Sequence, residues 1–446
     1  MLPRLVLLLS LFFAGCAHYP VNARLQKFDP HAGYRFENFP PTADNTDDLF
    51  ILLSLSGGGS RAAAFSYGVL EELQKTPITY AGKPRTLLDE VDVITSVSGS
   101  SVTSAYYALR REKIFEEFPR RYFGTDIEGH LWLRVSNPIN WWRLGSPTFD
   151  RIDLAAEMYD DDIFDHATYA DLIRAHQRPY VILNASDTAR GCRFEFTQEQ
   201  FDFLYSDLAS VPLARAVAAS AAYPVFFSPV TLDNQPHGTD FAEPGWISTA
   251  LANADKSPRI ARRAADLRAC ENAVARPHVR LLDGAIADYM GLRGPMEGFQ
   301  SDSPDFSLRR LLDAGKIKKL VVISVNAVRT PAPDWDRKTS APGWYDMLYY
   351  TASTPIYNNT LDTITVFKDV FAADAKRVAE MGGPKYESWL ISVNFNSVPD
   401  EALRRRLENI ESSLSIKPAQ ADDLRRGASL SLQASPDFAN LLKTLR

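Results

Sequence analysis

The sequence has little cysteine, little histidine and no excess of positive charge, and each shortage excludes a class of protein. Three cysteines in 446 residues are too few for a disulfide-rich scaffold. The formal net charge of -6 argues against a nucleic-acid-binding protein, which would show a basic patch or stripe. No histidine, cysteine or carboxylate residues have the spacing of a metal site such as His-Glu-x-x-His. We therefore expect a globular protein that needs neither a metal nor another cofactor.

Long apolar runs are also missing, apart from a short one at the N-terminus. Residues 5–13 are almost wholly apolar, follow the positive charge of Arg4 and precede Ala14-Gly15-Cys16. The run is too short to span a bilayer, and its pattern is typical of a secretory signal peptide over residues 1–15. Small residues directly before a cysteine resemble a bacterial lipobox. Cys16 would then carry diacylglycerol and an N-acyl chain such as palmitate; the alternative is an ordinary cleaved signal.

The residue after Cys16 favours one membrane over the other. Ala17 stands where an aspartate would resemble an inner-membrane retention signal, so we expect a lipid-anchored protein of the bacterial outer membrane. Two or more acyl chains anchor a protein stably, because each buried CH₂ contributes about 0.8 kcal/mol. In an oxidising periplasm Cys192 and Cys270 either form a disulfide or stay unpaired, and the sequence leaves both possibilities open.

Apolar runs and helical periodicity alternate from residue 49 onward. Residues 16–48 are polar and rich in proline, which predicts a lipidated N-terminus followed by a tether. The alternation predicts an α/β layered fold with a largely parallel sheet. We predict one domain over 49–446, with a core over about 49–326 and a helical part over about 327–446. The predicted strands cover residues 49–55, 91–97, 179–184, 226–231, 279–282 and 320–326, and the predicted helices cover 61–74, 102–117, 214–222, 360–381, 400–414 and 436–445.

An aromatic segment at 123–149 differs from the rest. It contains Trp132, Trp141 and Trp142 among glycine, asparagine and proline residues. Tryptophan suits the interface between water and lipid, so the segment is either a lid or a membrane-contacting lip over a site. The alternative is a loop buried against the helices, and we favour it because tryptophan is a common core residue.

A glycine-rich loop follows the first predicted strand and opens the first predicted helix. Its sequence is Ser56-Gly57-Gly58-Gly59-Ser60-Arg61. Glycines permit positive φ angles, and N–H groups at a helix N-terminus bind anions, either a phosphate or the oxyanion of acyl transfer. The Gly-Lys-Ser/Thr ending of a P-loop is missing. Ala62 fits the last position of the dinucleotide-binding fingerprint, so that alternative stays open.

A serine follows the second predicted strand in the same way. Ser98 lies between the apolar stretch 91–97 and the predicted helix 102–117. A serine at a tight strand-to-helix turn exposes its Oγ to a substrate, and the N–H of Gly99 would join an oxyanion hole. The usual glycines of such an elbow are replaced by Ser96 and Ser100. The alternative is a serine-rich helix cap without chemistry.

The third candidate is an aspartate. Asp283 and Gly284 follow the predicted strand 279–282, and ligands gather at the carboxyl ends of strands in open α/β sheets. The alternative is an ordinary Asp-Gly turn. His278 would lie roughly 16 Å from Asp283 on the same strand, so it cannot serve the same site. Four other histidines, His130, His166, His176 and His237, have no catalytic context. A hydrolase here would therefore need a serine–carboxylate dyad.

Together the glycine loop, the serine turn about 40 residues later and the distant Asp-Gly resemble the patatin-like phospholipase family. The resemblance also includes residues 178–187, 193–197 and 215–224, and it covers about 49–326 well. It implies a three-layer α/β/α fold with additional C-terminal helices. By the same resemblance Ser98 is the nucleophile and Asp283 the base, and the oxyanion hole is formed by Gly57, Gly58, Gly59 and Arg61 together with Gly99.

The resemblance implies a phospholipase or esterase that cleaves acyl esters at a membrane surface, without a metal. Its partners would be the lipid substrate and the membrane that holds the anchor. Two alternatives stay open. In one, the acyl-enzyme is passed to an alcohol, which makes the protein an acyltransferase. In the other, the substitutions Ser96 and Ser100 mark a catalytically inactive lipid-binding protein.

Overall fold

The computed structural model describes residues 17–224, 226–301, 307–329 and 337–445. The predicted signal peptide at 1–15 and Cys16 lie outside these residues. The predicted α/β fold with a mostly parallel sheet is confirmed. Within the described residues, no helix is both long enough and apolar enough to cross a membrane.

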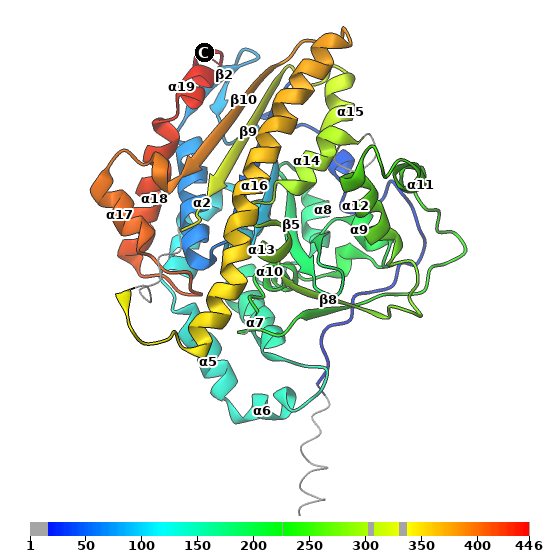
Figure 1. Cartoon of the computed structure of the whole chain (residues 1–446), viewed down its shortest axis with the longest axis vertical. Helices are drawn as coiled ribbons and strands as arrows, with labels where there is room; N and C mark the ends of the chain where they lie inside the picture. The colour runs from blue at the N-terminus through cyan, green and yellow to red at the C-terminus, as the bar shows by residue number, and fades with distance from the viewer. Residues whose placement is uncertain (1–16, 225, 302–306, 330–336, 446) are drawn as a thin grey trace, which may run out of the picture.

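An eight-stranded sheet forms the centre of the described part of the chain (Figure 1). Its strands are β1 (Leu49–Leu55), β4 (Val91–Val97), β5 (Tyr180–Asp187), β6 (Cys192–Glu195), β7 (Val230–Asp233), β8 (His278–Asp283), β9 (Lys319–Asn326) and β10 (Glu387–Asn394). They lie in the order β10-β9-β1-β4-β5-β8-β7, and β6 pairs with β5. The five strands from β10 to β5 are parallel, whereas β6, β7 and β8 pair antiparallel with their neighbours. Every residue of β1 and β4 is buried, because helices cover both faces of the sheet.

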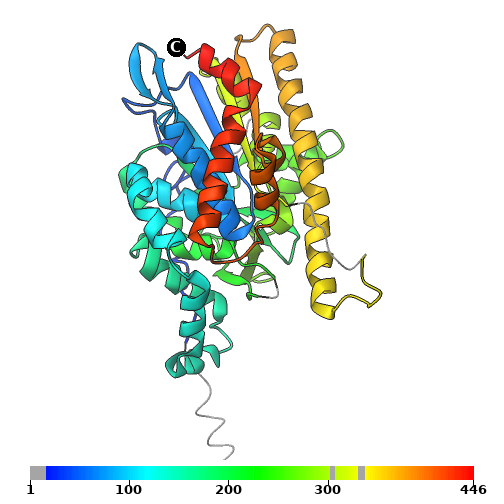
Figure 2. The same ribbon diagram turned by 90° about the vertical axis from the view of Figure 1, so that its left-hand side faces the viewer.

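The direction of two neighbouring side chains separates the two helical layers. Thr95 Oγ1 donates to Gly291 O at 3.0 Å, whereas the Ser96 hydroxyl bonds the Ser104 hydroxyl of α3 at 2.6 Å. Successive strand residues point to opposite faces, so α3 and the segment around Gly291 cover opposite sides of the sheet. Helices α2 and α18 pack together on the layer of α3 (Figure 2), and α16 packs on α13 and α14.

The remaining elements complete these layers. The helices are α2 (Gly59–Gln74), α3 (Gly99–Arg110), α4 (Ile114–Phe118), α5 (Ile127–Ser136), α6 (Pro138–Leu144), α7 (Arg151–Tyr159), α8 (Tyr169–Ala175), α9 (Gln198–Asp202), α10 (Leu213–Ser220), α11 (Gly245–Ala252), α12 (Pro258–Arg268), α13 (Ala285–Asp288), α14 (Arg293–Gln300), α15 (Leu308–Asp313), α16 (Trp344–Glu380), α17 (Glu401–Glu408), α18 (Pro418–Gln433) and α19 (Pro436–Lys443). Short 3₁₀ turns cover Phe36–Asn38, Arg111–Lys113, Leu208–Ser210 and Phe395–Ser397, π turns cover Pro119–Phe123 and Asp160–Phe164, and a hairpin joins β2 (Pro77–Tyr80) to β3 (Lys83–Thr86).

Two elements of the C-terminal part depart from its predicted helical character. Strand β10 lies at the edge of the sheet, parallel to β9, in a region predicted to be helical. Helix α18 was not predicted, and it packs along α2 and β10. The C-terminal part thus completes both the sheet and one helical layer.

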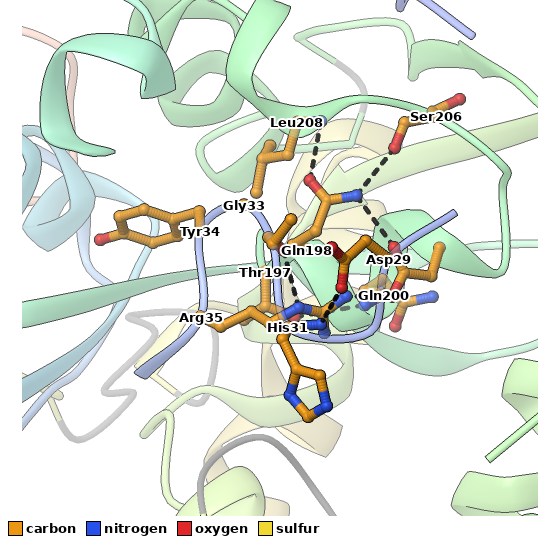
Figure 3. A network of polar contacts seen from close by, with 12 residues as sticks. Asp29, His31, Gly33, Tyr34, Arg35, Thr197, Gln198, Gln200, Ser206 and Leu208 are labelled. Atoms are coloured by element: carbon orange, nitrogen blue, oxygen red, sulfur yellow. Dashed lines mark hydrogen bonds and ion pairs between the residues drawn. The ribbon is translucent and has the colours of Figure 1, made fainter. Parts of the chain in front are cut away.

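The segment predicted as a tether is packed on the domain instead. Tyr34, Phe36 and Phe39 are buried in the main core. Figure 3 shows how Gln198 of α9 holds this segment: its backbone N–H donates to Tyr34 O at 3.0 Å, and its side chain lies against Gly33. Gly33 has a φ of +88°, and a Cβ there would lie 2.7 Å from Gln198 Cγ. The expectation of a free tether is therefore wrong for residues 17–48.

The cysteines Cys192 and Cys270 form no disulfide. Cys192 is partly buried and Cys270 is buried, and both thiols are free. Burial raises the pKa of the Cys192 thiol to about 12 and that of Cys270 to about 11, so both stay protonated at neutral pH.

Candidate active site

The register of β5 explains why Ser98 and Asp283 meet, although 185 residues separate them. Strand β4 runs parallel to β5 and ends with Val97 opposite Asn184. Strand β8 runs antiparallel to β5 and ends with Asp283 opposite Ala185. Because β6 occupies the other edge of β5 at these positions, β4 and β8 share one edge and meet end to end. The residues that follow both strands are thereby brought to one point.

Ser98 occupies a strained turn between β4 and α3. Its φ is +54° and its ψ is -127°, a backbone conformation that residues other than glycine rarely adopt. Backbone strain of this kind costs about 1–3 kcal/mol and persists where surrounding contacts hold it. Here the Ser98 N–H donates to Ser220 Oγ at 2.9 Å, and Ser220 Oγ donates to Asn184 O at 2.6 Å. Ser220, at the end of α10, thus ties the turn to β5.

Ser98 and Asp283 are joined by a direct hydrogen bond. Ser98 Oγ donates to Asp283 Oδ2 at 2.7 Å, and Asp283 Oδ1 accepts the Ala285 N–H at 2.9 Å. Asp283 is buried, with 2% of its surface exposed. Burial raises the pKa of Asp283 to about 6, against the opposing effect of the two hydrogen bonds. The arrangement can transfer the hydroxyl proton of Ser98 to a carboxylate that ionises near neutral pH.

The glycine loop lies directly against the Ser98 turn. A Cβ on Gly99 would come within 1.9 Å of Gly59 O, so only glycine fits after the serine. Gly58 has a φ of +136° and Gly59 a φ of +62°. Among the described residues, the N–H groups of Gly58, Gly59 and Gly99 have no hydrogen-bond acceptor. Three backbone donors beside the serine form a site that an oxyanion fits.

Two residues of the predicted oxyanion set are engaged elsewhere. The Gly57 N–H donates to Tyr289 O at 3.0 Å, so it is not available to an oxyanion. The buried Arg61 donates from Nε to Ala327 O at 3.1 Å and from Nη1 to Ile410 O at 2.8 Å. These bonds tie the start of α2 to the segments that follow β9 and α17. The Gly57 N–H therefore supports the loop instead of donating to an oxyanion, and Arg61 fixes the loop through these two bonds.

The serines that replace the usual elbow glycines fit within the turn. Ser96 and Ser100 are fully buried. The Ser100 hydroxyl donates to Ser56 O at 2.6 Å and lies 2.9 Å from the Ser66 hydroxyl. Ser96 bonds Ser104, as described above. Both side chains point away from the Ser98–Asp283 pair into the interface between the sheet and its helices. The feature that favoured an inactive protein is therefore compatible with an intact site.

The histidines lie apart from this pair. His278 stands at the opposite end of β8 from Asp283, is exposed, and contacts Asp233 at 3.1 Å. Within the described ranges no histidine forms a hydrogen bond to Ser98 or Asp283. His130 and His166 face Asp162 and Asp160 on the surface, and His237 contacts Phe203 O.

Sequence reasoning missed the residues that support the turn. Ser220 Oγ accepts the Ser98 N–H and donates to the Asn184 carbonyl. The Tyr289 carbonyl accepts the Gly57 N–H. Asn184 also donates to Thr95 Oγ1 at 2.9 Å and to Ser96 O at 3.0 Å. A buried asparagine inside an apolar strand was the signal for Asn184, because buried amides need specific partners.

Comparisons with known proteins bear on the same region. A family model described as patatin-like phospholipase matches residues 53–291, which is more than half of the chain and includes Gly57, Ser98 and Asp283. No curated protein sequence matches significantly. Among solved structures, human GIVD cytosolic phospholipase A2 is 14% identical with a TM-score of 0.42, covering 90% of this chain and 62% of that chain. VipD from Legionella pneumophila is 12% identical with a TM-score of 0.33, covering 98% and 73%. The chain thus spans about three fifths of the length of the human protein.

Proposed function

The chain belongs to the patatin-like phospholipase family, and we propose that it hydrolyses the acyl esters of lipids with a Ser98–Asp283 dyad. The observation that carries this proposal is the hydrogen bond from Ser98 Oγ to Asp283 Oδ2 at 2.7 Å. It joins a serine in a strained turn to a buried carboxyl. A nucleophile paired with a base within hydrogen-bond reach is the general signature of covalent catalysis.

The first half of the reaction forms an acyl-enzyme. Ser98 Oγ attacks the ester carbonyl carbon while its proton passes to Asp283 Oδ2. The carbonyl oxygen becomes an oxyanion, which accepts hydrogen bonds from the backbone N–H groups of Gly58, Gly59 and Gly99. One such donor is typically worth roughly 3 kcal/mol of transition-state stabilisation. The bond to the alcohol then breaks, and the leaving oxygen takes the proton from Asp283.

The second half returns the enzyme to its starting state. Asp283 takes a proton from a water molecule, whose oxygen attacks the acyl carbonyl carbon. The same three N–H groups stabilise the second oxyanion. Its collapse releases the fatty acid, and Ser98 Oγ recovers its proton from Asp283. Both halves need the carboxylate form of Asp283, which a pKa of about 6 supplies at neutral pH. The raised pKa also makes this carboxylate a stronger base than an ordinary aspartate.

The proposal is tested by Ser98→Ala. We expect this variant to lose release of fatty acid from phosphatidylcholine vesicles and from a soluble short-chain ester. The matched control is Ser104→Ala, which removes a buried hydroxyl from the same network without touching the dyad. Turnover by Ser98→Ala equal to that of the control would overturn the assignment. Added alcohol acceptors distinguish hydrolysis from acyl transfer by their products.

We further propose that Cys16 carries the lipid anchor and that the protein resides in the bacterial outer membrane. The support is the run of small residues before Cys16 and the alanine at position 17. Growth with radiolabelled palmitate tests it: the full chain should incorporate label and fractionate with the outer membrane, and Cys16→Ser should do neither. A labelled Cys16→Ser protein would contradict the proposal.

A further inference from the structure

The aromatic segment of the sequence forms an exposed apolar surface. Helices α5 and α6 carry five large side chains with substantial exposure, which we call the α5–α6 surface: Trp132 (59%), Leu133 (72%), Ile139 (71%), Trp141 (61%) and Trp142 (45%). The expectation that this segment is buried against other helices is therefore wrong. Exposed apolar side chains that gather on one element mark an interaction site, whereas scattered ones do not.

The two helices are held in place although they bury little. Helix α5 buries only Ile127 and Leu131, and α6 has no buried residue. Asn137 joins them, because its side chain accepts the Ile139 N–H at 3.0 Å and caps α6. The sequence thus forms a defined pair of helices that keeps its large apolar side chains in contact with solvent.

Three polar groups at this surface are paired within the chain. Trp141 Nε1 donates to Val135 O at 3.0 Å, so its ring can leave water without losing a hydrogen bond. Arg134 pairs with Asp161 at 2.9 Å, and Arg143 pairs with Glu157 at 2.8 Å. Neutralised cations beside exposed apolar side chains suit an apolar medium better than an anionic partner.

The α5–α6 surface lies beside the point where the chain leaves the described domain. The Ala17 carbonyl accepts hydrogen bonds from the hydroxyls of Ser146 and Thr148, just after α6. The Tyr19 N–H donates to Thr148 O at 2.7 Å. An acyl chain on Cys16 would therefore begin one peptide bond away from a residue that is fixed to the end of α6.

Ser98 lies toward the same end of the molecule as α5 and α6. In Figures 1 and 2 the parallel strands β9 and β10 point toward the end that carries α5 and α6, and Ser98 follows the parallel strand β4. The first turns of α16 reach this end in both views. These turns carry the exposed Trp344, Met347 and Leu348, and in Figure 2 they lie apart from α5 and α6.

We propose that the α5–α6 surface inserts into the interfacial region of a lipid bilayer and holds the Ser98 side of the domain against the membrane. This inference rests on the lipid anchor on Cys16 that is part of the proposed function. It does not depend on the proposed hydrolytic activity. The acyl chains on Cys16 would hold the protein at the membrane at one point, and the α5–α6 surface would add the second contact that sets which side of the domain faces the lipid. Because Arg134 and Arg143 are paired, insertion should depend little on anionic lipid or on salt.

Tryptophan quenching tests the insertion directly. The full chain carrying Ser98→Ala, which leaves the lipid intact, is bound to phosphatidylcholine vesicles that contain lipids brominated in the acyl chain. We expect the bromines to quench its fluorescence, and Trp132→Phe/Trp141→Phe/Trp142→Phe to lose most of that quenching. The control Trp246→Phe/Trp389→Phe should keep it. Equal quenching in the two variants, or none in either, would overturn the proposal.

A second experiment links the surface to activity. Leu133→Asp/Ile139→Asp should lower hydrolysis of vesicle phosphatidylcholine by about tenfold or more, because burial of one such side chain is worth at least that factor. Hydrolysis of a soluble short-chain ester should stay within about twofold. The control Val274→Asp/Met381→Asp changes two exposed apolar residues elsewhere, 93% and 68% exposed, and should affect neither substrate.

The outcomes separate this inference from the proposed function. If the wild-type protein hydrolyses neither substrate, but the brominated lipids still quench Trp132, Trp141 and Trp142, the insertion stands and the proposed catalytic dyad fails. If Leu133→Asp/Ile139→Asp hydrolyses both substrates as well as wild type does, the insertion fails and the dyad stands. A dimer in sedimentation that Trp141→Asp dissociates, with no quenching, would assign the surface to a second copy of the chain and overturn the proposal.

Discussion

Replacement of Asp283 by asparagine should have opposite effects on activity and on stability. The buried carboxyl has a pKa of about 6 in the folded protein, against an ordinary value of 3.8. Above pH 6 the folded state must hold a desolvated carboxylate, and this lowers the free energy of unfolding. As the pH falls from about 6 to about 4, the folded state binds the proton before the unfolded state does, and wild-type stability rises. The neutral amide of the Asp283→Asn variant binds no proton in this range.

The size of this effect follows from the shift. Each pKa unit corresponds to 1.36 kcal/mol, so the shift amounts to about 3 kcal/mol. We therefore expect the stability of Asp283→Asn relative to wild type to be about 3 kcal/mol more favourable near pH 8 than near pH 4. Other titrating groups are common to both proteins and cancel in the comparison.

Urea unfolding of both proteins near pH 8 and near pH 4 measures this difference. The same samples give the activity: kcat/KM of wild type should fall as the pH drops below about 6, where Asp283 is protonated. Asp283→Asn should be slower by a factor of about 10²–10⁴, the usual contribution of a general base. A relative stability that does not change with pH would refute the raised pKa, and an active Asp283→Asn would refute the role of the base.

Three further predictions concern the glycine loop, the Ser98 turn and the side chain of Gln198. Gly99→Ala places a Cβ 1.9 Å from Gly59 O and should lower kcat by about 100-fold or more. In Gly57→Ala the new Cβ would lie 3.2 Å from the Tyr289 ring, and kcat should fall only by about a few-fold. Equal losses of kcat in the two variants would contradict the close approach of Gly99 to Gly59. Ser220→Ala should lower kcat with little change in KM, and more than Ser104→Ala at a similar loss of stability, about 1–3 kcal/mol; a kcat equal to that of Ser104→Ala would remove Ser220 from the positioning of Ser98. Gln198→Ala leaves Leu208 N and Ser206 O without their Gln198 partner and should destabilise by about 2 kcal/mol in urea unfolding at unchanged kcat; an unchanged midpoint would contradict the contribution of these two hydrogen bonds.

The local elements of the site were predictable because short-range signals mark them. Apolar runs ending in glycine or serine predicted β1 and β4 and the turns that follow them. The pairing of Ser98 with Asp283 came only from the family resemblance. It depends on β4 and β8 meeting on one edge of β5, and that register is set by strand pairings far apart in the chain.

Other features were hidden because local polarity conflicted with tertiary packing. Prolines and acidic residues in 17–48 predicted a tether, but Tyr34, Phe36 and Phe39 anchor the segment in the core. Strand β10 mixes polar and apolar residues, as an edge strand with only partial burial does. Asn137 and Pro138 looked like loop residues, yet they end α5 and begin α6.

The most direct test of the central claim is the site of covalent labelling by a fluorophosphonate with a long alkyl chain. Such a reagent reacts preferentially with an activated serine hydroxyl, and peptide mass spectrometry locates the adduct. We expect one adduct per chain on Ser98, formed faster as the pH rises through about 6 and abolished in Asp283→Asn. An adduct on another serine, or labelling of Asp283→Asn at the wild-type rate, would contradict the Ser98–Asp283 dyad.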